Sequence, residues 1–341
     1  MKFGVLQFYS WPGRRIPLAE VYERAWTRID IMEHSGYDAV WLAEHHFSTY
    51  SVCPSIHMMG THIAAKTKRL RIGMGVSLTP FYHPLRLAEE VALLDVLSDG
   101  RVNWGAGRGF DANEYRVFGI EREDSYPKFR EHLDVVLKAW TEERLTYSGD
   151  YCSFEDVEVL PKPVQAPHPP VWLATTSPDA VMWAASRGFS ILMDPHASHD
   201  EIGRKRALYD DELQAAGFGS NNRDIPVARS IALGRTEAEA YETARRGAEF
   251  MFGSYLRKPG QVLSASHHKT INMNTVAAAD TDPAERVERY IDDVIIWGTP
   301  EKVRDDLEQY RETMKLNYLL CTPLSHKSFM LFTDEVMPHF Q

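Results

Sequence analysis

The chain has 341 residues, of which 44% are hydrophobic and 25% are charged, and its formal net charge at pH 7 is −10. This composition is typical of a globular protein with a sizeable core, and the negative charge argues against a general surface for nucleic acid or anionic membranes. The three cysteines have no C-x-x-C spacing, and no apolar run reaches the roughly 18 residues that a membrane span needs. The first ten residues do not resemble a signal peptide. We therefore expect a cytoplasmic protein.

Short strand-like runs alternate with stretches of helical periodicity along the chain. The stretches 18–36 and 84–100 end in glycine, whereas 177–188 and 299–314 begin with a capping residue followed by proline. Eight alternating strand and helix units favour a parallel sheet closed into a (β/α)8 TIM barrel, with a doubly wound open sheet as the alternative. The eight predicted strands are 2–8, 38–43, 70–78, 101–107, 170–175, 189–193, 225–234 and 317–322.

The open-sheet alternative lacks its nucleotide-binding signature. The best glycine-rich stretch, GAGRGF at 105–110, has glycine at every second position, whereas the dinucleotide motif is G-x-G-x-x-G. We therefore predict one barrel domain over 1–341. Residues 256–290 follow the seventh strand and its helix without clear periodicity, and we expect them to form an inserted lid or mobile loop.

The stretch WLAEHHFSTY places Glu44, His45 and His46 directly after the second predicted strand. Active-site residues of a TIM barrel come from such strand ends, and an imidazole there can act as a general acid or base. A zinc site needs at least three suitably spaced ligands, which adjacent histidines do not supply. His45 is the stronger candidate for proton transfer. For His46, the alternative to a functional role is that its ring only forms hydrogen bonds with backbone groups.

Glycines alternate along two strands that are neighbours in a barrel. They are Gly73 and Gly75 in the third predicted strand, Gly105 and Gly107 in the fourth, and Gly109 just after the fourth. Alternate glycines leave one face of a strand without side chains, so that a flat ring can lie against the backbone. The alternative is that small residues fit a crowded barrel interior.

Side chains that could bind a phosphate lie among these glycines and at the end of the fifth predicted strand. Arg108 lies within the glycine-rich stretch, and Thr175, Thr176 and Ser177 precede the helix after the fifth strand. A guanidinium group and the free N–H groups at a helix start both bind anions. The alternatives to phosphate binding are that Arg108 forms an ion pair and that the hydroxyls of 175–177 cap the helix. A flat ring beside a phosphate indicates an FMN-like cofactor.

Six segments, in this order, carry a resemblance to a known family: GYDAVWLAEHHF, HPLRLAEEVALLDVLSDGRVNWGAGRGF, EYRVFG, PVWLATTSPDAVMWAASRG, GTPEKV and EVMPHF. With them the chain resembles the bacterial luciferase-like flavin monooxygenases, particularly the luciferase α-subunit and related alkanal monooxygenases. The resemblance covers nearly the whole chain and is thinnest at 195–290. It implies a two-component enzyme that takes reduced FMN from a separate NAD(P)H:flavin reductase and reacts it with O2 to form a peroxyflavin. This species would oxygenate a small organic substrate by hydroxylation, Baeyer–Villiger oxidation or aldehyde oxidation. A homodimer or heterodimer is implied, with no nucleic-acid or membrane partner.

The resemblance also assigns roles to single residues. His45 matches the catalytic histidine, Arg108 the arginine that binds the flavin phosphate, and Ser177 a serine that contacts it. The peptide Gly75–Val76 matches a non-proline cis bond beneath the flavin ring, and 256–290 matches the mobile lid. We expect His45 and Glu44 to be the catalytic residues: His45 handles a proton at the flavin peroxide or the substrate, and Glu44 orients nearby backbone or the ring. The predicted cofactor residues are Gly75, Val76, Gly107, Arg108, Thr176 and Ser177, the candidate substrate contacts are His46, His83, Asp111 and His196, and no metal is expected.

Three departures from the luciferase pattern bear on the substrate. Gly107 replaces a cysteine beside the flavin, Ala180 replaces a threonine near the phosphate, and 193–199 replaces a tryptophan-bearing pocket segment. They argue against light emission and a long-chain aldehyde substrate. The alternatives are a deazaflavin-dependent hydride-transfer enzyme, a non-catalytic flavin-binding subunit, and a barrel hydrolase that uses Glu44, Asp111 and Asp194.

Overall fold

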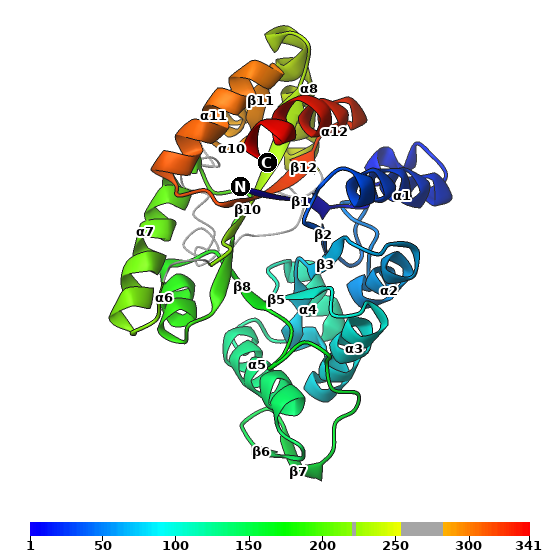
Figure 1. Ribbon diagram of the computed structural model, residues 1–341, viewed down its shortest axis with the longest axis vertical. Helices are drawn as coiled ribbons and strands as arrows, with labels where there is room; N and C mark the ends of the chain where they lie inside the picture. The colour runs from blue at the N-terminus through cyan, green and yellow to red at the C-terminus, as the bar shows by residue number, and fades with distance from the viewer. Residues whose placement is uncertain (220–222, 254–281) are drawn as a thin grey trace. The chain divides into compact units, whose positions relative to one another are not determined.

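The structure is a computed structural model that describes residues 1–219, 223–253 and 282–341. The chain divides into two compact units, Gln7–Ala174 and Met1–Leu6 with Thr175–Gln341 (Figure 1). The single domain over 1–341 stays a prediction. Most of the lid predicted at 256–290 lies outside the described residues, and its last part forms the start of a helix at Pro283.

The unit Gln7–Ala174 is built on parallel strands followed by helices. β2 pairs with β3, β3 with β5, and β5 with β8, while the short β4 lies beside β5. The strands are β2 (Ala39–Leu42), β3 (Arg71–Met74), β4 (Ser77–Leu78), β5 (Val102–Gly107) and β8 (Val171–Thr175). All residues of β2 and β5 are buried, as expected for parallel strands that are covered on both faces.

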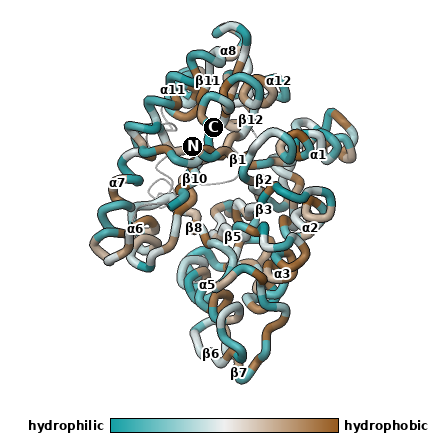
Figure 2. The backbone as a smooth tube through the Cα atoms, in the orientation of Figure 1, coloured by the Kyte–Doolittle hydropathy of each residue, from teal (hydrophilic) through white to brown (hydrophobic). Residues whose placement is uncertain are grey.

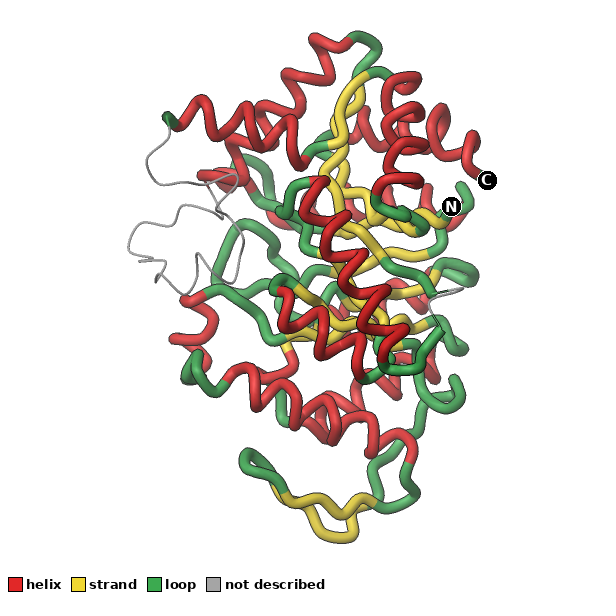
Figure 3. The backbone as a smooth tube through the Cα atoms, turned by 90° about the vertical axis from the view of Figure 1, so that its left-hand side faces the viewer, coloured by secondary structure: helices red, strands yellow, loops and turns green. Residues whose placement is uncertain are grey.

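Helices and one hairpin complete this unit. The helices are α1 (Leu18–His34), α2 (Ile56–Lys66), α3 (Pro84–Leu97), α4 (Ala112–Phe118) and α5 (Ser125–Thr141), with 3-10 turns η1 (Pro12–Arg14) and η2 (Thr79–Phe81). α1 buries one stripe of residues at helical spacing and ends just before Gly36, which has a φ of 81°. The antiparallel hairpin of β6 (Leu145–Ser148) and β7 (Ser153–Val157) stands apart from the other strands of the unit (Figure 3).

The described residues of the other unit contain five strands, all of which are paired in parallel. β1 pairs with β12, and β10 pairs with β12, β11 and β9. They are β1 (Lys2–Gln7), β9 (Ser190–Met193), β10 (Pro226–Leu233), β11 (Ile296–Gly298) and β12 (Tyr318–Pro323). The helices are α6 (Pro178–Ser186), α7 (His199–Ala215), α8 (Glu237–Met251), α10 (Pro283–Val294), α11 (Pro300–Thr313) and α12 (His326–Leu331), followed by η4 (Phe332–Val336) and η5 (Met337–Phe340).

All eight predicted strands are present, and their parallel order with intervening helices is that of a (β/α)8 barrel, as predicted. The predicted third strand, 70–78, is divided into β3 and β4 at Gly75–Val76. Hydrophilic and hydrophobic residues alternate along the helices of each unit (Figure 2), which is typical of helices that cover a sheet with one face. In the parts of the chain that the structure describes, no helix is long and apolar enough to cross a membrane.

Candidate active site

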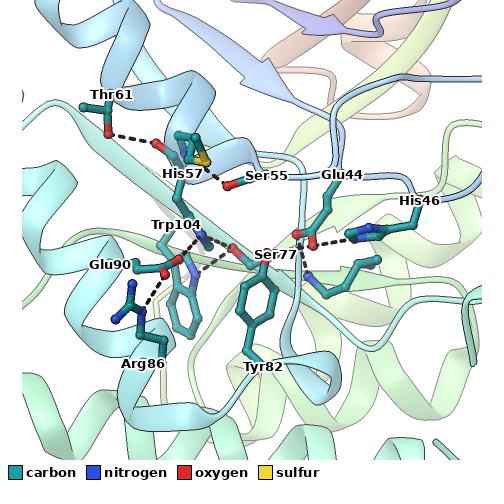
Figure 4. Close-up of polar contacts among 12 residues, drawn as sticks. Glu44, His46, Ser55, His57, Thr61, Ser77, Tyr82, Arg86, Glu90 and Trp104 are labelled. Carbon is teal, nitrogen blue, oxygen red and sulfur yellow. Dashed lines mark hydrogen bonds and ion pairs between the residues drawn. The ribbon is translucent and has the colours of Figure 1, made fainter. Parts of the chain in front are cut away.

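Glu44 is a buried carboxylate that joins three parts of its unit (Figure 4). Its Oε1 accepts a hydrogen bond from the Tyr82 hydroxyl at 2.7 Å and lies 3.0 Å from Nε2 of His46. Its Oε2 accepts the backbone N–H of Leu78 at 3.2 Å. A carboxylate only accepts, so the facing His46 nitrogen carries a proton. Glu44 therefore connects the end of β2 with β4 and with the turn that precedes α3.

The charge of Glu44 affects two neighbouring acids. Burial, reinforced by this charge, raises the pKa of the Tyr82 hydroxyl and raises the pKa of the Cys53 thiol to about 12. Both groups therefore stay protonated near neutral pH. Tyr82 acts as a hydrogen-bond donor to Glu44, and Cys53 is not a thiolate nucleophile.

His45 lies beside a different carboxylate, that of Glu114 on α4. Nδ1 of His45 lies 3.6 Å from Oε1 of Glu114, and the same oxygen accepts the backbone N–H of His46 at 2.9 Å. Glu114 is 2% exposed, so its charge acts in a poorly hydrated environment. The rings of Phe8, Tyr50 and Phe110 surround the imidazole of His45. Glu114 was not among the predicted site residues, although it opens the EYRVFG segment of the resemblance.

The glycines of β3 and β5 make room for neighbouring side chains. A Cβ on Gly107 would lie 2.5 Å from Cγ2 of Val76, and a Cβ on Gly73 would overlap the Trp41 ring. At these two positions the structure supports the crowded-interior interpretation. The predicted cis peptide Gly75–Val76 is present, and the following β4 pairs with β5 through Leu78 and Gly107.

Positive charge gathers beside these strands at the start of α5. The guanidinium of Arg108 lies 3.4 Å from the Ser125 hydroxyl and 5.6 Å from the centre of the Tyr126 ring. The guanidinium of Arg130 lies 4.4 Å from the centre of the same ring. Burial, reinforced by the charge of Arg108, lowers the pKa of Arg122. Guanidinium groups that repel one another favour binding of an anion, so this set of donors fits the phosphate of a flavin nucleotide.

The other predicted phosphate residues belong to the second unit. The Ser177 hydroxyl accepts the backbone N–H of Ala180 at 3.3 Å and so caps α6, which is the capping alternative. The hydroxyl of Thr175 points to the carbonyl of Leu192 at 3.5 Å, and Thr176 is half-buried. Contact of Thr176 and Ser177 with a phosphate stays a prediction.

The candidate substrate residues have different surroundings. Asp111 is buried and caps α4 by accepting the N–H of Asn113 at 2.8 Å. His83 is exposed at the start of α3, with its ring 5.6 Å from that of Phe154. In the other unit, Nδ1 of His196 lies 2.8 Å from the Tyr290 hydroxyl. Substrate contact by these residues and by His46 stays a prediction. Over residues 1–219, 223–253 and 282–341, no group of three His, Cys, Asp or Glu side chains could hold a metal ion.

Comparison with known proteins identifies the family. A family model described as luciferase-like monooxygenase matches residues 1–315, so the chain belongs to this family, as its motifs predicted. The oxygenase component of the flavin-dependent trigonelline monooxygenase of Acinetobacter baylyi is 25% identical over 338 residues, which cover 94% of this chain and 90% of that protein. These similarities support an oxidoreductase of the monooxygenase kind.

Two solved structures share the fold over nearly the whole chain. Monooxygenase RslO1 from Streptomyces bottropensis has a TM-score of 0.83 and 25% sequence identity, with 100% of both chains covered. The coenzyme F420-dependent tetrahydromethanopterin reductase of Methanopyrus kandleri has a TM-score of 0.75 and 19% identity, covering 100% of this chain and 99% of that one. The second likeness shows the fold alone.

Proposed function

We propose that the protein is the oxygenase component of a two-component monooxygenase that binds reduced FMN and uses O2 to oxygenate a small organic substrate. The partly exposed His45 beside the buried Glu114 carries this proposal, because it places an imidazole next to a carboxylate in the unit that also holds Arg108, Arg122 and Arg130. Reduced FMN, when bound, supplies the two electrons with which one oxygen atom enters the substrate and the other leaves as water.

The protein's own groups would bind the cofactor and keep it in place. Arg108 would hold the phosphate, with the positive charge of Arg122 nearby. The flavin ring would lie along the backbone of Gly75 and Val76, beside β5. This arrangement is supported by the concentration of guanidinium groups at the start of α5 and just after β5.

The imidazole of His45 would move a proton between its Nε2 and the substrate or the reduced oxygen. Glu114 is an acceptor at 3.6 Å from Nδ1, too long for a strong hydrogen bond but close enough to favour a proton on that nitrogen. Nε2 is then the nitrogen to which we assign the exchange. Glu44 would act as a positioning residue, because its two oxygens already accept bonds from Tyr82, His46 and Leu78.

Isotope incorporation tests this function. The protein is mixed anaerobically with reduced FMN and a panel of aldehydes, ketones and aromatic compounds, exposed to 18O2, and the products are analysed by mass spectrometry. We expect one 18O atom in a product with the wild type, loss of that product with His45→Ala, and no change with the control His34→Ala, whose side chain is 73% exposed. Absence of any flavin-dependent product would contradict the proposal.

A separate reductase is supported by the relative's description as an oxygenase component. With oxidised FMN and NAD(P)H, product should form only when a flavin reductase is added. The fold shared with an F420-dependent reductase keeps deazaflavin hydride transfer as a second candidate. Dissociation constants for reduced FMN and reduced F420 separate the two, and tighter binding of F420 without oxygen uptake would favour the second.

A further inference from the structure

A buried chain of polar contacts links α3, α2, β4 and β5 in one unit (Figure 4). Nδ1 of His57 lies 3.1 Å from Oε2 of Glu90, and Nε2 lies 3.0 Å from the Ser77 hydroxyl. The indole N–H of Trp104 donates to the same hydroxyl at 3.3 Å. Ser77 is fully buried and His57 is 3% exposed, so these polar groups depend on one another for partners.

The proton positions in this chain follow from the donors and acceptors. The hydrogen bond from His57, helped by Arg86 at 2.8 Å, holds the pKa of Glu90 at about 2, so Glu90 is a carboxylate and Nδ1 of His57 carries a proton. Trp104 can only donate to Ser77. With a neutral imidazole, the Ser77 hydroxyl donates to Nε2, and every polar hydrogen between Glu90 and Trp104 has an acceptor.

Serine, histidine and carboxylate in this order also form the catalytic triads of hydrolases. Here the Ser77 oxygen is enclosed and already accepts the Trp104 N–H, so an electrophile has no approach to it. The chain of contacts therefore fixes Ser77 in place and does not activate it.

The position of Ser77 determines the position of Val76. Ser77 pairs with Ala106 in β4, the next residue Leu78 is held by Glu44, and Cγ2 of Val76 fills the space left by the missing side chain of Gly107. We propose that His57 is a positioning residue that holds Val76 against β5 through Ser77, and so shapes the surface that supports the flavin ring. This role rests on the proposed function.

The test separates binding of the ring from binding of the phosphate. His57→Leu removes both contacts at similar size, and the matched control is His62→Leu, an exposed position on the same helix. Reduced FMN and reduced riboflavin are titrated anaerobically by calorimetry, and the visible absorption band of the bound oxidised flavin is recorded. We expect His57→Leu to weaken both ligands by the same factor, about tenfold, and to change the band shape, whereas His62→Leu changes neither.

A second variant keeps the test valid if His57→Leu does not fold. Ser77→Ala removes one oxygen and should weaken both flavins in the same way. Unchanged affinities and spectra in both variants, with normal binding by the wild type, would overturn this role and leave the proposed function standing. Equal losses of flavin affinity in His57→Leu and His62→Leu would overturn it too, because they would show a general effect of substitutions in α2. Failure of the wild type to bind flavin would overturn the proposed function and this role with it.

Discussion

The carboxylate of Glu114 lies 3.6 Å from Nδ1 of His45 and, with the same oxygen, accepts the backbone N–H of His46 at 2.9 Å. The ring of His46 turns to Glu44 instead, 3.0 Å from its Oε1. The rings of two adjacent histidines thus face two different buried carboxylates. This division supports proton transfer by His45 and a positioning role for Glu44 and the ring of His46.

Glu114→Gln should lower the rate of product formation by about 10-fold to 100-fold, because it removes the negative charge beside Nδ1 while its amide oxygen can still accept the His46 N–H. Affinity for reduced FMN should change less than twofold. Single-turnover rates and anaerobic titration measure the two effects. Glu121→Gln, at an exposed position just after α4, is the control. A wild-type rate in Glu114→Gln would refute the assigned role.

Glu44→Gln should act mainly on stability. The carboxylate accepts from Tyr82, His46 and Leu78, and the amide group of glutamine would place a donor against at least one of these donors. A buried donor without an acceptor costs about 1–3 kcal/mol, so the free energy of unfolding should fall by that amount. Urea unfolding followed by circular dichroism checks this. A stability equal to that of the wild type would mean that the three bonds do not form in solution.

Much of the fold was predictable because hydrophobic runs and helix-end residues are local signals. All eight strands and the helices α1, α3, α6 and α11 lie where the pattern indicated. The β6–β7 hairpin was missed because β7, at Ser153–Val157, is largely exposed and has no alternating apolar residues. The hydrophobic pattern of 70–78 does not indicate its division into β3 and β4. Only the family resemblance indicated a special peptide at Gly75–Val76.

The candidate site was predictable to the extent that its residues stand next to one another in the chain. The pattern at the end of β2 identified His45, but Glu114 is separated from His46 by 68 positions. His57 is likewise 20 positions from Ser77 and 33 from Glu90. Such pairs are set by strand order and helix packing, and hydrophobic patterns or helix-end residues do not indicate them. The EYRVFG segment of the resemblance begins at Glu114, but it does not show that this side chain faces His45.

Gly107→Ala should destabilise the protein by about 1–3 kcal/mol, because the new methyl group would meet Cγ2 of Val76 at 2.5 Å and Cβ of Ala174 at 3.3 Å. Flavin affinity should fall as Val76 is displaced. Val76→Ala removes the obstructing methyl groups, so the double variant should recover most of the stability that Gly107→Ala loses. Urea unfolding of the two single variants and the double variant gives their coupling. Additive effects would show that Val76 does not occupy the space above Gly107.

Arg108→Met should discriminate between two flavins. Loss of a charged hydrogen-bond donor to the phosphate costs about 1.5–3 kcal/mol, which raises the dissociation constant of FMN by about 10-fold to 100-fold. Riboflavin lacks the phosphate, so its affinity should not change. Arg116→Met, on the exposed side of α4, is the matched control. Equal weakening of FMN and riboflavin would place Arg108 away from the phosphate.

Acid should destabilise the protein partly through His132. This side chain is 3% exposed on α5, with Nδ1 facing the carbonyl of Thr79 at 3.4 Å, and burial lowers its pKa to about 4. In the unfolded chain the pKa of histidine is about 6.5, so between these values the unfolded state binds more protons and the free energy of unfolding falls as the pH falls. At pH 5 the loss from this group amounts to about 2 kcal/mol relative to neutral pH.

His132→Gln removes the titrating group, so its free energy of unfolding should fall less than that of the wild type between pH 7.5 and pH 5. The comparison uses the change with pH, because the substitution also alters packing at every pH. The exposed His34→Gln should follow the wild type, since its side chain is 73% exposed. His199, whose pKa burial lowers to about 3, stays in all three proteins and contributes equally. The same pH dependence in His132→Gln and the wild type would show that folding does not lower the pKa of His132.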